Sequence, residues 1–386
     1  MQVPSIPFSI ASLRVRRVLW QLFALVILAL LAVWFVHNAF VNFEVRRLGV
    51  GFDFLVRPAN ISIGESLIDY EAGRPVYVAI LVGLLNTLLV SIVGIVLATA
   101  LGVMVGVSRL SPNPLLRGLA TVYVEFLRNV PLLAHLFLIY VALQALPPLR
   151  SAISLGGLVF LSNRGLVVPG IEAERVLLSV VPALAVGLAA AVLLTRRAVR
   201  LQVATGRRPA VLAWSVLATL GTLSVTWQLF GSTLSMTLPR LQGLSFVGGQ
   251  ALSPELTTLV AGLTLYFSAF IAENVRGGIL AVPNGQWQAA AALGLTRSQT
   301  LRFIILPQAI RVIVPPTTSQ YLDLAKTSSL GIAIGYPDLV AVTNSVITDT
   351  GRAVECVGII MVAFLVINLA ISVPMNALNA HLRLRQ

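Results

Sequence analysis

The sequence has few of the residues from which enzymes build reactive centres. It contains one cysteine, Cys356, which excludes an internal disulfide and any zinc or iron–sulfur site made of cysteines. Three histidines, His37, His135 and His381, are scattered along the chain. No nucleophile–base pair and no metal-ligand spacing stands out, which argues against an intramembrane enzyme.

Lysine is nearly absent, and its single occurrence is informative. A Walker A loop that binds nucleotide phosphates needs Gly-Lys followed by Ser or Thr. The one lysine, Lys326, follows alanine rather than glycine. The chain therefore has no such loop, and any ATP that drives its activity must be hydrolysed by a partner.

Hydrophobic residues, in contrast, make up 57% of the 386 residues, and charged residues only 11%. This is the composition of a membrane protein rather than of a soluble domain. The sequence predicts an all-α polytopic membrane protein with about eight transmembrane helices. We expect them at 19–40, 77–107, between 131 and 147, and at 176–195, 209–230, 255–271, 308–334 and 357–378.

The first apolar run and the second each carry a specific expectation. The run at 19–40 exceeds the core of a signal peptide and lacks a small-residue cleavage site, so we interpret it as a retained helix. In the second run, Gly94, Ala98, Gly102 and Gly106 recur every four residues. Such a stripe lets another helix pack closely.

The net charge of +13 is explained by topology. If both termini are cytoplasmic, 17 of the 26 arginines lie in cytoplasmic segments. The opposite side holds 9 arginines and 11 of the 14 acidic residues. This asymmetry follows the positive-inside rule, so nucleic-acid binding is not needed to explain the charge.

Residues 284–307, which read NGQWQAAAALGLTRSQTLRFIILP, form the most distinctive stretch. Asn284 offers a helix N-cap, and Gly294 stands where a helix C-cap needs a left-handed residue. The residues 296–299 match a capping box that opens a second helix, which we expect to break at Pro307. The alanine face of the first helix indicates a knob that seats in another protein's groove. An ordinary helix-turn-helix between spans is the alternative.

This stretch resembles the "EAA" loop of binding-protein-dependent ABC importer permeases. In that family the loop is a cytoplasmic coupling helix that docks in a cleft of the ATPase subunit. Gln288 replaces the usual glutamate, which removes a charge but keeps length and hydrogen-bonding capacity. The resemblance assigns seven residues to ATPase coupling, namely Gln288, Ala289, Ala290, Gly294, Ile304, Leu306 and Pro307.

A second segment resembles a hallmark of the polar amino-acid branch of these permeases, the histidine/glutamine type. It runs from Glu125 to Leu133 and contains Arg128, Asn129 and Pro131. Glu125 and Arg128 are three residues apart, so they can pair on one helix face. Pro131 suits a helix start or a kink. We therefore expect the charged pair to act as a structural clamp, with direct substrate contact as the alternative.

A third segment, 321–329, places ionisable residues inside an apolar span. Such residues are costly in lipid and point by default to a pathway or site. Asp323 and Lys326 are three apart and can neutralise each other, or exchange partners with a zwitterionic amino acid. The alternative is a structural pair near the cytoplasmic surface. The residues expected to line a substrate pathway or gate are Asp323, Lys326, Thr327, Ser328 and Ser329.

The resemblance implies a type I ABC importer permease core at 77–380, with an extra helix pair inserted at about 147–250. Residues 1–76 would be a basic arm, the first transmembrane helix and an external segment, and 381–386 a cytoplasmic tail. The implied location is a bacterial cytoplasmic (inner) membrane, crossed several times, with both termini cytoplasmic.

The implied function is ATP-driven import of polar L-amino acids delivered by an external solute-binding protein. Its partners would be a cytoplasmic ATPase dimer, a second permease subunit and the periplasmic or external amino-acid-binding protein. The chain would bind no cofactor, since ATP and Mg²⁺ would sit on the ATPase. Two alternatives remain: the same architecture for another solute such as an opine or sugar, and an ATP-independent channel or secondary transporter.

Overall fold

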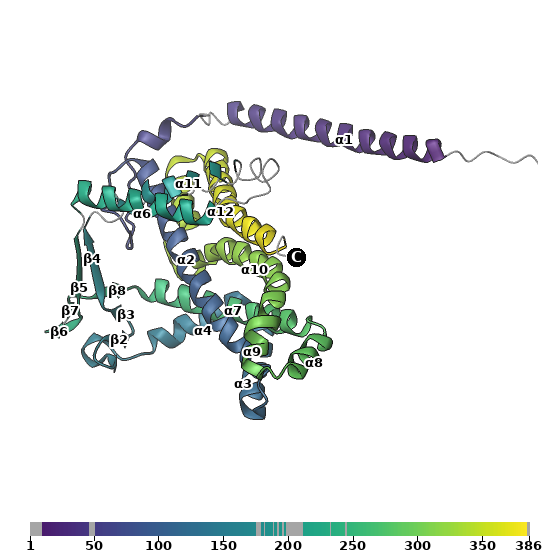
Figure 1. Cartoon of the computed structure of the whole chain (residues 1–386). Coiled ribbons are helices and arrows are strands. Elements are labelled where there is room, and N and C mark those ends of the chain that lie inside the picture. The colour runs from purple at the N-terminus through teal and green to yellow at the C-terminus, as the bar shows by residue number, and fades with distance from the viewer. Residues whose placement is uncertain are drawn as a thin grey trace, which may run out of the picture. The chain divides into compact units, whose positions relative to one another are not determined.

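The computed structural model describes residues 10–45, 51–174, 179–180, 182–187, 189–190, 193–194, 197, 211–231, 233–243 and 245–383. Two compact units make up the chain (Figure 1). The first consists of residues 1–87 and 337–370, and the second of residues 88–336 and 371–386. The helix expected at 176–195 lies largely outside the described residues.

The first unit contains α1 (Ile10–Val45) and a small core where α2 begins. Phe54, from the 3₁₀ helix η1, packs there with Leu339 and Val342 of α11. The backbone N–H of Leu339 donates to the hydroxyl of Thr87 on α2 over 3.0 Å. The bounds of these elements are η1 (Asp53–Val56), α2 (Val76–Ser108), α11 (Leu339–Thr350) and α12 (Ala353–Arg383).

Helix α7 (Pro254–Leu280) is the centre of the second unit. Ser253 caps its start by accepting a hydrogen bond from the N–H of Leu256 over 3.0 Å. Its buried residues, among them Leu259 and Leu263, form a core with neighbouring helices. These neighbours are the later part of α2, α3 (Pro114–Asn129), α4 (Leu132–Gln144) and α10 (Leu306–Thr327).

The stripe of small residues on α2 packs closely in this unit, as predicted. A Cβ added at Gly102 would lie 2.7 Å from Cβ of Ile271, and one at Gly106 would lie 2.7 Å from the carbonyl oxygen of Ala272. Glycine permits these approaches because it has no side chain. Helices α2 and α7 are therefore in close contact near the C-terminal ends of both helices.

The second unit is not purely helical, so the prediction of an all-α protein is wrong in this detail. Short strands occupy the segments on either side of α6 (Val211–Phe230), inside the region of about 147–250 where an inserted helix pair was expected. One sheet has the order β1-β2-β3-β8, and the pairs β4–β5 and β6–β7 form two-stranded ribbons. In Figure 1 the sheet lies where α7 begins. The strands are β1 (Ile153–Leu155), β2 (Val159–Ser162), β3 (Gly165–Val168), β4 (Gly170–Glu174), β5 (Thr233–Thr237), β6 (Arg240–Gln242), β7 (Ser245–Val247) and β8 (Gln250–Leu252), with the 3₁₀ turn η2 (Leu149–Ser151) before them.

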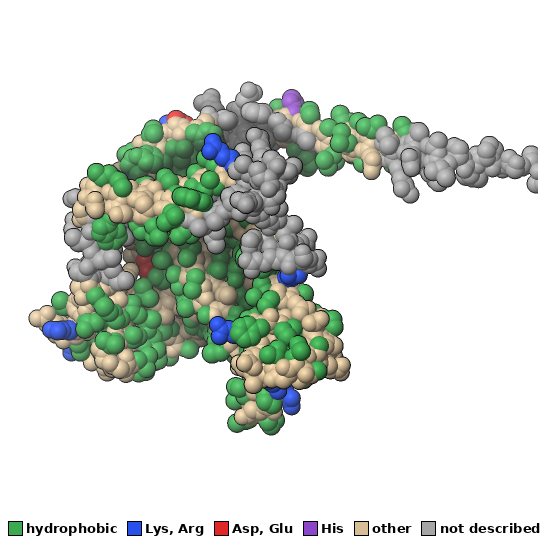
Figure 2. All heavy atoms as spheres, in the orientation of Figure 1, with side chains coloured by type: hydrophobic (Ala, Val, Ile, Leu, Met, Phe, Trp, Pro, Cys, Tyr) green, Lys and Arg blue, Asp and Glu red, His purple; other side chains and the backbone are tan. Residues whose placement is uncertain are grey.

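Among the described residues, three helices are long and apolar enough to cross a membrane: α2, α7 and α12. Two bent pairs raise this number to five if each is one span. In one pair α3 and α4 meet at 108°, and the other pair consists of the helical segment Arg297–Ile334 and α11. Figure 2 shows hydrophobic side chains spread widely over the described surface, which suits a lipid environment.

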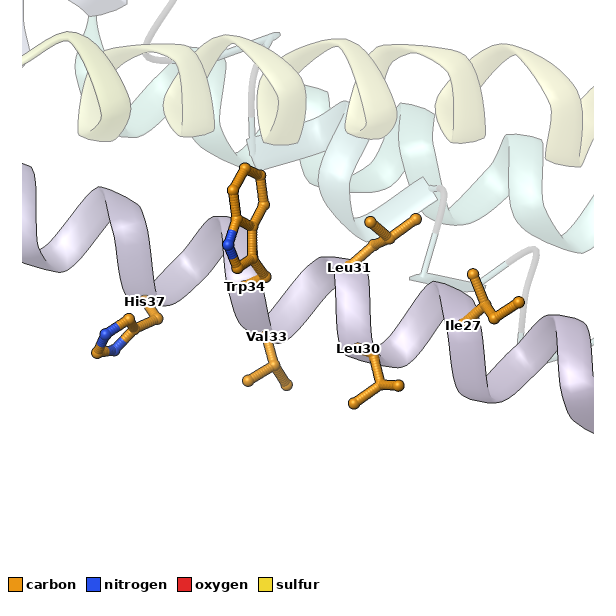
Figure 3. A pocket seen from close by; sticks show the side chains of 6 residues that line it. All are labelled: Ile27, Leu30, Leu31, Val33, Trp34 and His37. Carbon is orange, nitrogen blue, oxygen red and sulfur yellow. The ribbon is translucent and has the colours of Figure 1, made fainter.

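Helix α1 presents its apolar side chains outward. Trp20, Leu28 and Trp34 are each more than half exposed. A shallow depression on α1 is lined by Ile27, Leu30, Leu31, Val33, Trp34 and His37, which all belong to this helix (Figure 3). A helix with exposed apolar residues along its length is suited to contact with lipid or another transmembrane helix.

Candidate functional site

The predicted coupling segment begins with α8 (Asn284–Ala292). Gly294 follows with a left-handed φ of 74°. Its N–H bonds to the carbonyl oxygen of Ala291 over 3.0 Å, and the N–H of Leu295 bonds to that of Ala290 over 3.1 Å. These two bonds form a Schellman motif, so the glycine ends the helix as predicted.

The second helix of the segment, α9 (Arg297–Thr300), opens with the predicted capping box. The hydroxyl of Thr296 accepts a bond from the N–H of Gln299, whose side chain accepts one from the N–H of Thr296 over 2.9 Å. A π-helical turn, Leu301–Ile305, then leads directly into α10. The predicted break at Pro307 is wrong, because this proline lies in the first turn of α10, where a missing N–H is tolerated.

Exposure divides the predicted coupling residues into two groups. Ala290 is fully buried and Ile304 is half-buried, so these two build the corner itself. The outward surface consists of Gln288, Ala289, Gly294, Leu306 and Pro307. It also includes two large apolar side chains that the motif did not single out, Leu293 at 76% exposure and Phe303 at 63%.

The charged pair of the third predicted segment lies on one exposed stripe of α10. The closest approach of Lys326 Nζ to an Asp323 carboxylate oxygen is 4.0 Å, and both side chains are more than half exposed. The other exposed residues of this stripe are Val312, Pro316 and Ser319. Their spacing of three or four residues places all five on one helix face. The described part of the chain leaves this face uncovered.

The three hydroxyl residues after the pair bond to their own helix. Thr327 donates to the carbonyl oxygen of Asp323 over 2.7 Å, and Ser329 donates to that of Lys326 over 2.8 Å. Ser328 is buried and donates to Ala325 over 2.8 Å. These bonds lie where α10 tightens into the 3₁₀ helix η4 (Ser328–Ile334), so the hydroxyls satisfy carbonyl groups at the helix end.

The expected pairing of Glu125 with Arg128 is wrong. Glu125 lies 3.8 Å from the guanidinium of Arg109 on the chain just after α2. Arg128 instead lies over the ring of Phe270 on α7, 5.3 Å from its centroid. Both partners come from elsewhere in the sequence, so spacing within 125–133 does not reveal them. Asn129 ends α3, and Pro131 caps the start of α4, as the expected helix start or kink requires.

Sequence reasoning also missed an ion pair between α2 and α7. Arg109 pairs with Glu273, which in turn pairs with Arg276. The spacing of Glu273 and Arg276 is a helix-pair signal that the sequence carries. Among the described residues, no group of three or more His, Cys, Asp or Glu side chains is placed to hold a metal ion.

Comparison with known proteins identifies the family. Residues 98–386 match the family described as "Binding-protein-dependent transport system inner membrane component". The chain belongs to this family. This permease is therefore a multi-pass inner-membrane protein, and the family predicted from its motifs is confirmed.

Three relatives extend over nearly the whole permease. It is 43% identical to the putative amino-acid ABC transporter permease protein YhdX of Escherichia coli K12 (96% of this chain, 95% of the relative). It is 40% identical to the general L-amino acid transport system permease protein AapQ of Rhizobium johnstonii (96% and 92%). It is 37% identical to the glutamate/glutamine/aspartate/asparagine transport system permease protein BztB of Rhodobacter capsulatus (97% and 95%).

The family settles which component of the transporter this chain is. A binding-protein-dependent ABC transporter combines a permease with an ATPase and a solute-binding protein. The chain is the permease component and not itself the ATPase, which agrees with the lack of a Walker A loop. Permeases of this family bind no cofactor of their own.

Proposed function

We propose that this permease translocates polar L-amino acids, delivered by an external solute-binding protein, through an ATP-driven importer. The main support for this proposal is the coupling segment, residues 284–307. Its Schellman motif and capping box fix the turn between two helices, and the residues around Gln288 are exposed to a partner. The names of the three relatives give the substrate class, since each transports or is thought to transport amino acids. An opine or sugar as substrate is the weaker alternative, and nothing in these names favours it.

The partners follow from this role. A cytoplasmic ATPase dimer binds ATP and Mg²⁺, and its cleft receives the surface around Gln288, Ala289 and Gly294. The apolar side chains of Leu293 and Phe303 add to that surface, because large exposed apolar groups mark interaction sites. A second permease subunit, a paralogue or another copy, completes the pathway. ATP-driven closure of the ATPase then shifts the coupling segment and switches the helices between inward- and outward-facing states.

The proposed topology has eight crossings with both termini in the bacterial cytoplasm. Residues 1–76 form the arm, the first span and an external segment, and 77–380 form the importer core with a helix pair inserted at about 147–250. Residues 381–386 form the cytoplasmic tail. The arrangement of α7 supports this topology. Its 27 residues measure about 40 Å, enough for one crossing, and they separate the strand-bearing segment from the coupling segment.

The exposed stripe of α10 is the proposed pathway surface. Asp323 and Lys326 lie on it, and charged side chains at membrane depth face protein or water rather than lipid. The stripe therefore faces the second subunit or an aqueous path. There the carboxylate and the ammonium group are suited to the two charges of a zwitterionic substrate. Thr327, Ser328 and Ser329 shape the helix end next to the pair.

Co-purification followed by ATPase assays tests this function. The permease is expressed with its neighbouring subunits, and ATP hydrolysis is measured with the binding protein and a panel of amino acids, opines and sugars. We expect stimulation by polar L-amino acids. Stimulation by sugars or opines alone would contradict the substrate class, and uptake by vesicles that lack the ATPase would support a channel or secondary transporter.

A further inference from the structure

A compact ion network lies where α2, α3 and α7 come together in the second unit. Arg109 stands directly after α2, and its guanidinium pairs with Glu273 of α7. A second nitrogen of the same guanidinium lies 3.8 Å from Glu125 of α3. Glu273 also accepts two hydrogen bonds from Arg276, at 2.6 and 3.1 Å. Two arginines thus balance two glutamates drawn from three segments.

The Arg109 side chain is the most enclosed member of this network. It is 9% exposed, compared with 27% for Glu273 and 57% for Glu125. Its Nε is buried and has no hydrogen-bond partner among the described residues, so both ion contacts of this side chain are made by its two terminal nitrogens. Arginine suits this position because its planar fork can reach two carboxylates at once.

Close packing continues from the network along the same helices. One turn before Arg109, a Cβ at Gly106 would lie 2.9 Å from Cβ of Val275 on α7. On α3, the hydroxyl of Tyr123 lies 2.7 Å from that of Ser268 on α7. The ends of α2 and α3 are therefore attached to α7 by backbone proximity, by a hydrogen bond and by charge.

The attached end of α7 leads directly into the coupling segment. Three residues separate Leu280, the last residue of α7, from α8, and one of them, Val282, is buried in the core of the unit. Trp287 of α8 packs against the same core. A displacement of α8 is thus passed to α7 rather than absorbed by a loose linker.

We propose that Arg109 is a positioning residue that fastens α2 and α3 to α7, so that movement of the coupling segment is transmitted to all three helices. This proposal rests on the proposed coupling role of α8. Without the guanidinium, the ends of α2 and α3 lag behind α7. ATP is then hydrolysed with less substrate carried per cycle.

The test measures coupling in proteoliposomes that contain the assembled importer. Uptake of labelled amino acid and release of phosphate are recorded in the same vesicles, and their ratio is compared among variants. We expect Arg109→Gln and Glu273→Gln to lower this ratio at least about fivefold, the lower end of ordinary coupling between sites. Glu125→Gln should lower it less, because this contact is longer and more exposed.

Two further variants serve as references. Arg109→Lys keeps the positive charge and should restore only part of the ratio, because an ammonium group cannot reach both carboxylates as the planar fork does. Arg117→Gln removes an exposed arginine of α3 and should leave the ratio unchanged. A purely structural role of Arg109 would not change this ratio. Loss of stability lowers the yield of complex but not the amount of substrate transported per ATP.

Arg109→Gln complexes that transport at the parental ratio, even at reduced yield, would overturn the proposal. If this variant does not assemble, Glu273→Gln and Glu125→Gln decide by the same ratio, and parental values in both would overturn the proposal. Failure of the proposed function is distinguishable, since the parental complex itself would then show no ATPase stimulation by the binding protein.

Discussion

The hydroxyl of Tyr321 on α10 lies 2.8 Å from the hydroxyl of Thr99 on α2. Thr99 donates its own proton to the carbonyl oxygen of Ile95 over 2.6 Å, so Tyr321 is the donor in the contact between the helices. This bond fixes α10 to α2 within two residues of Asp323. The exposed charged stripe is thereby held on a face that α2 does not cover.

Removing this bond should destabilise the permease slightly. Tyr321→Phe and Thr99→Val should each lower the free energy of unfolding, with a coupling between them of about 0.6 kcal/mol, the average for such bonds between transmembrane helices. A double-mutant cycle on the purified permease in detergent measures the coupling. Additive effects of the two substitutions would show that the bond contributes nothing.

Substitution of Gly294 should uncouple the ATPase without preventing membrane insertion. Gly294→Val forces a β-branched residue into a left-handed conformation and distorts the corner of the coupling segment. The expected result is ATP hydrolysis with little uptake, or loss of ATPase co-purification. Gly285→Ala is the matched control, because it lies on α8 and a Cβ there meets nothing within 4 Å. Parental uptake by Gly294→Val would remove the support for the coupling role.

Asp323 and Lys326 can be tested as pathway residues. Lys326→Met leaves one charge unpaired, which costs at least about 2.5 kcal/mol at membrane depth and should impair assembly. Asp323→Leu with Lys326→Met removes both charges and should assemble again. If the pair lines the pathway, this double variant fails to take up zwitterionic amino acids. Assembly and uptake at the parental rate together would show that the pair is only structural.

Fusions to a compartment-specific reporter test the proposed topology. A fusion after Asn284 should report the cytoplasm, because the arginine distribution and the coupling role both place this segment inside. A fusion after Gly248, between β7 and β8, should report the external side. An external signal at Asn284 would reverse the whole arrangement.

Local sequence signals predicted the coupling segment well. The glycine cap at Gly294 and the capping box from Thr296 to Gln299 depend on a few adjacent residues, so their geometry follows from the sequence. The small-residue stripe on α2 was predictable for the same reason. Hydropathy located α2, α7 and α12, the described helices long and apolar enough to cross a membrane, because burial in lipid imposes a minimum apolar length.

Features that depend on distant neighbours were not predictable. Glu125 pairs with Arg109 rather than Arg128, and Ala290 is buried in a corner where α8 contacts α9 and the π turn. The strands that flank α6 have short, partly apolar sequences that resemble loops. The helix continues through Pro307 after the π turn Leu301–Ile305, and no local sequence motif predicts that turn.

ATP-dependent amino-acid uptake in proteoliposomes tests the central claim most directly. The permease is reconstituted with its ATPase and second permease subunit, and labelled polar L-amino acids are added with the binding protein on the external side. We predict uptake that requires both ATP and the binding protein and that is abolished by Gly294→Val but not by Gly285→Ala. Uptake that proceeds at the same rate without ATP or without the binding protein would contradict the account.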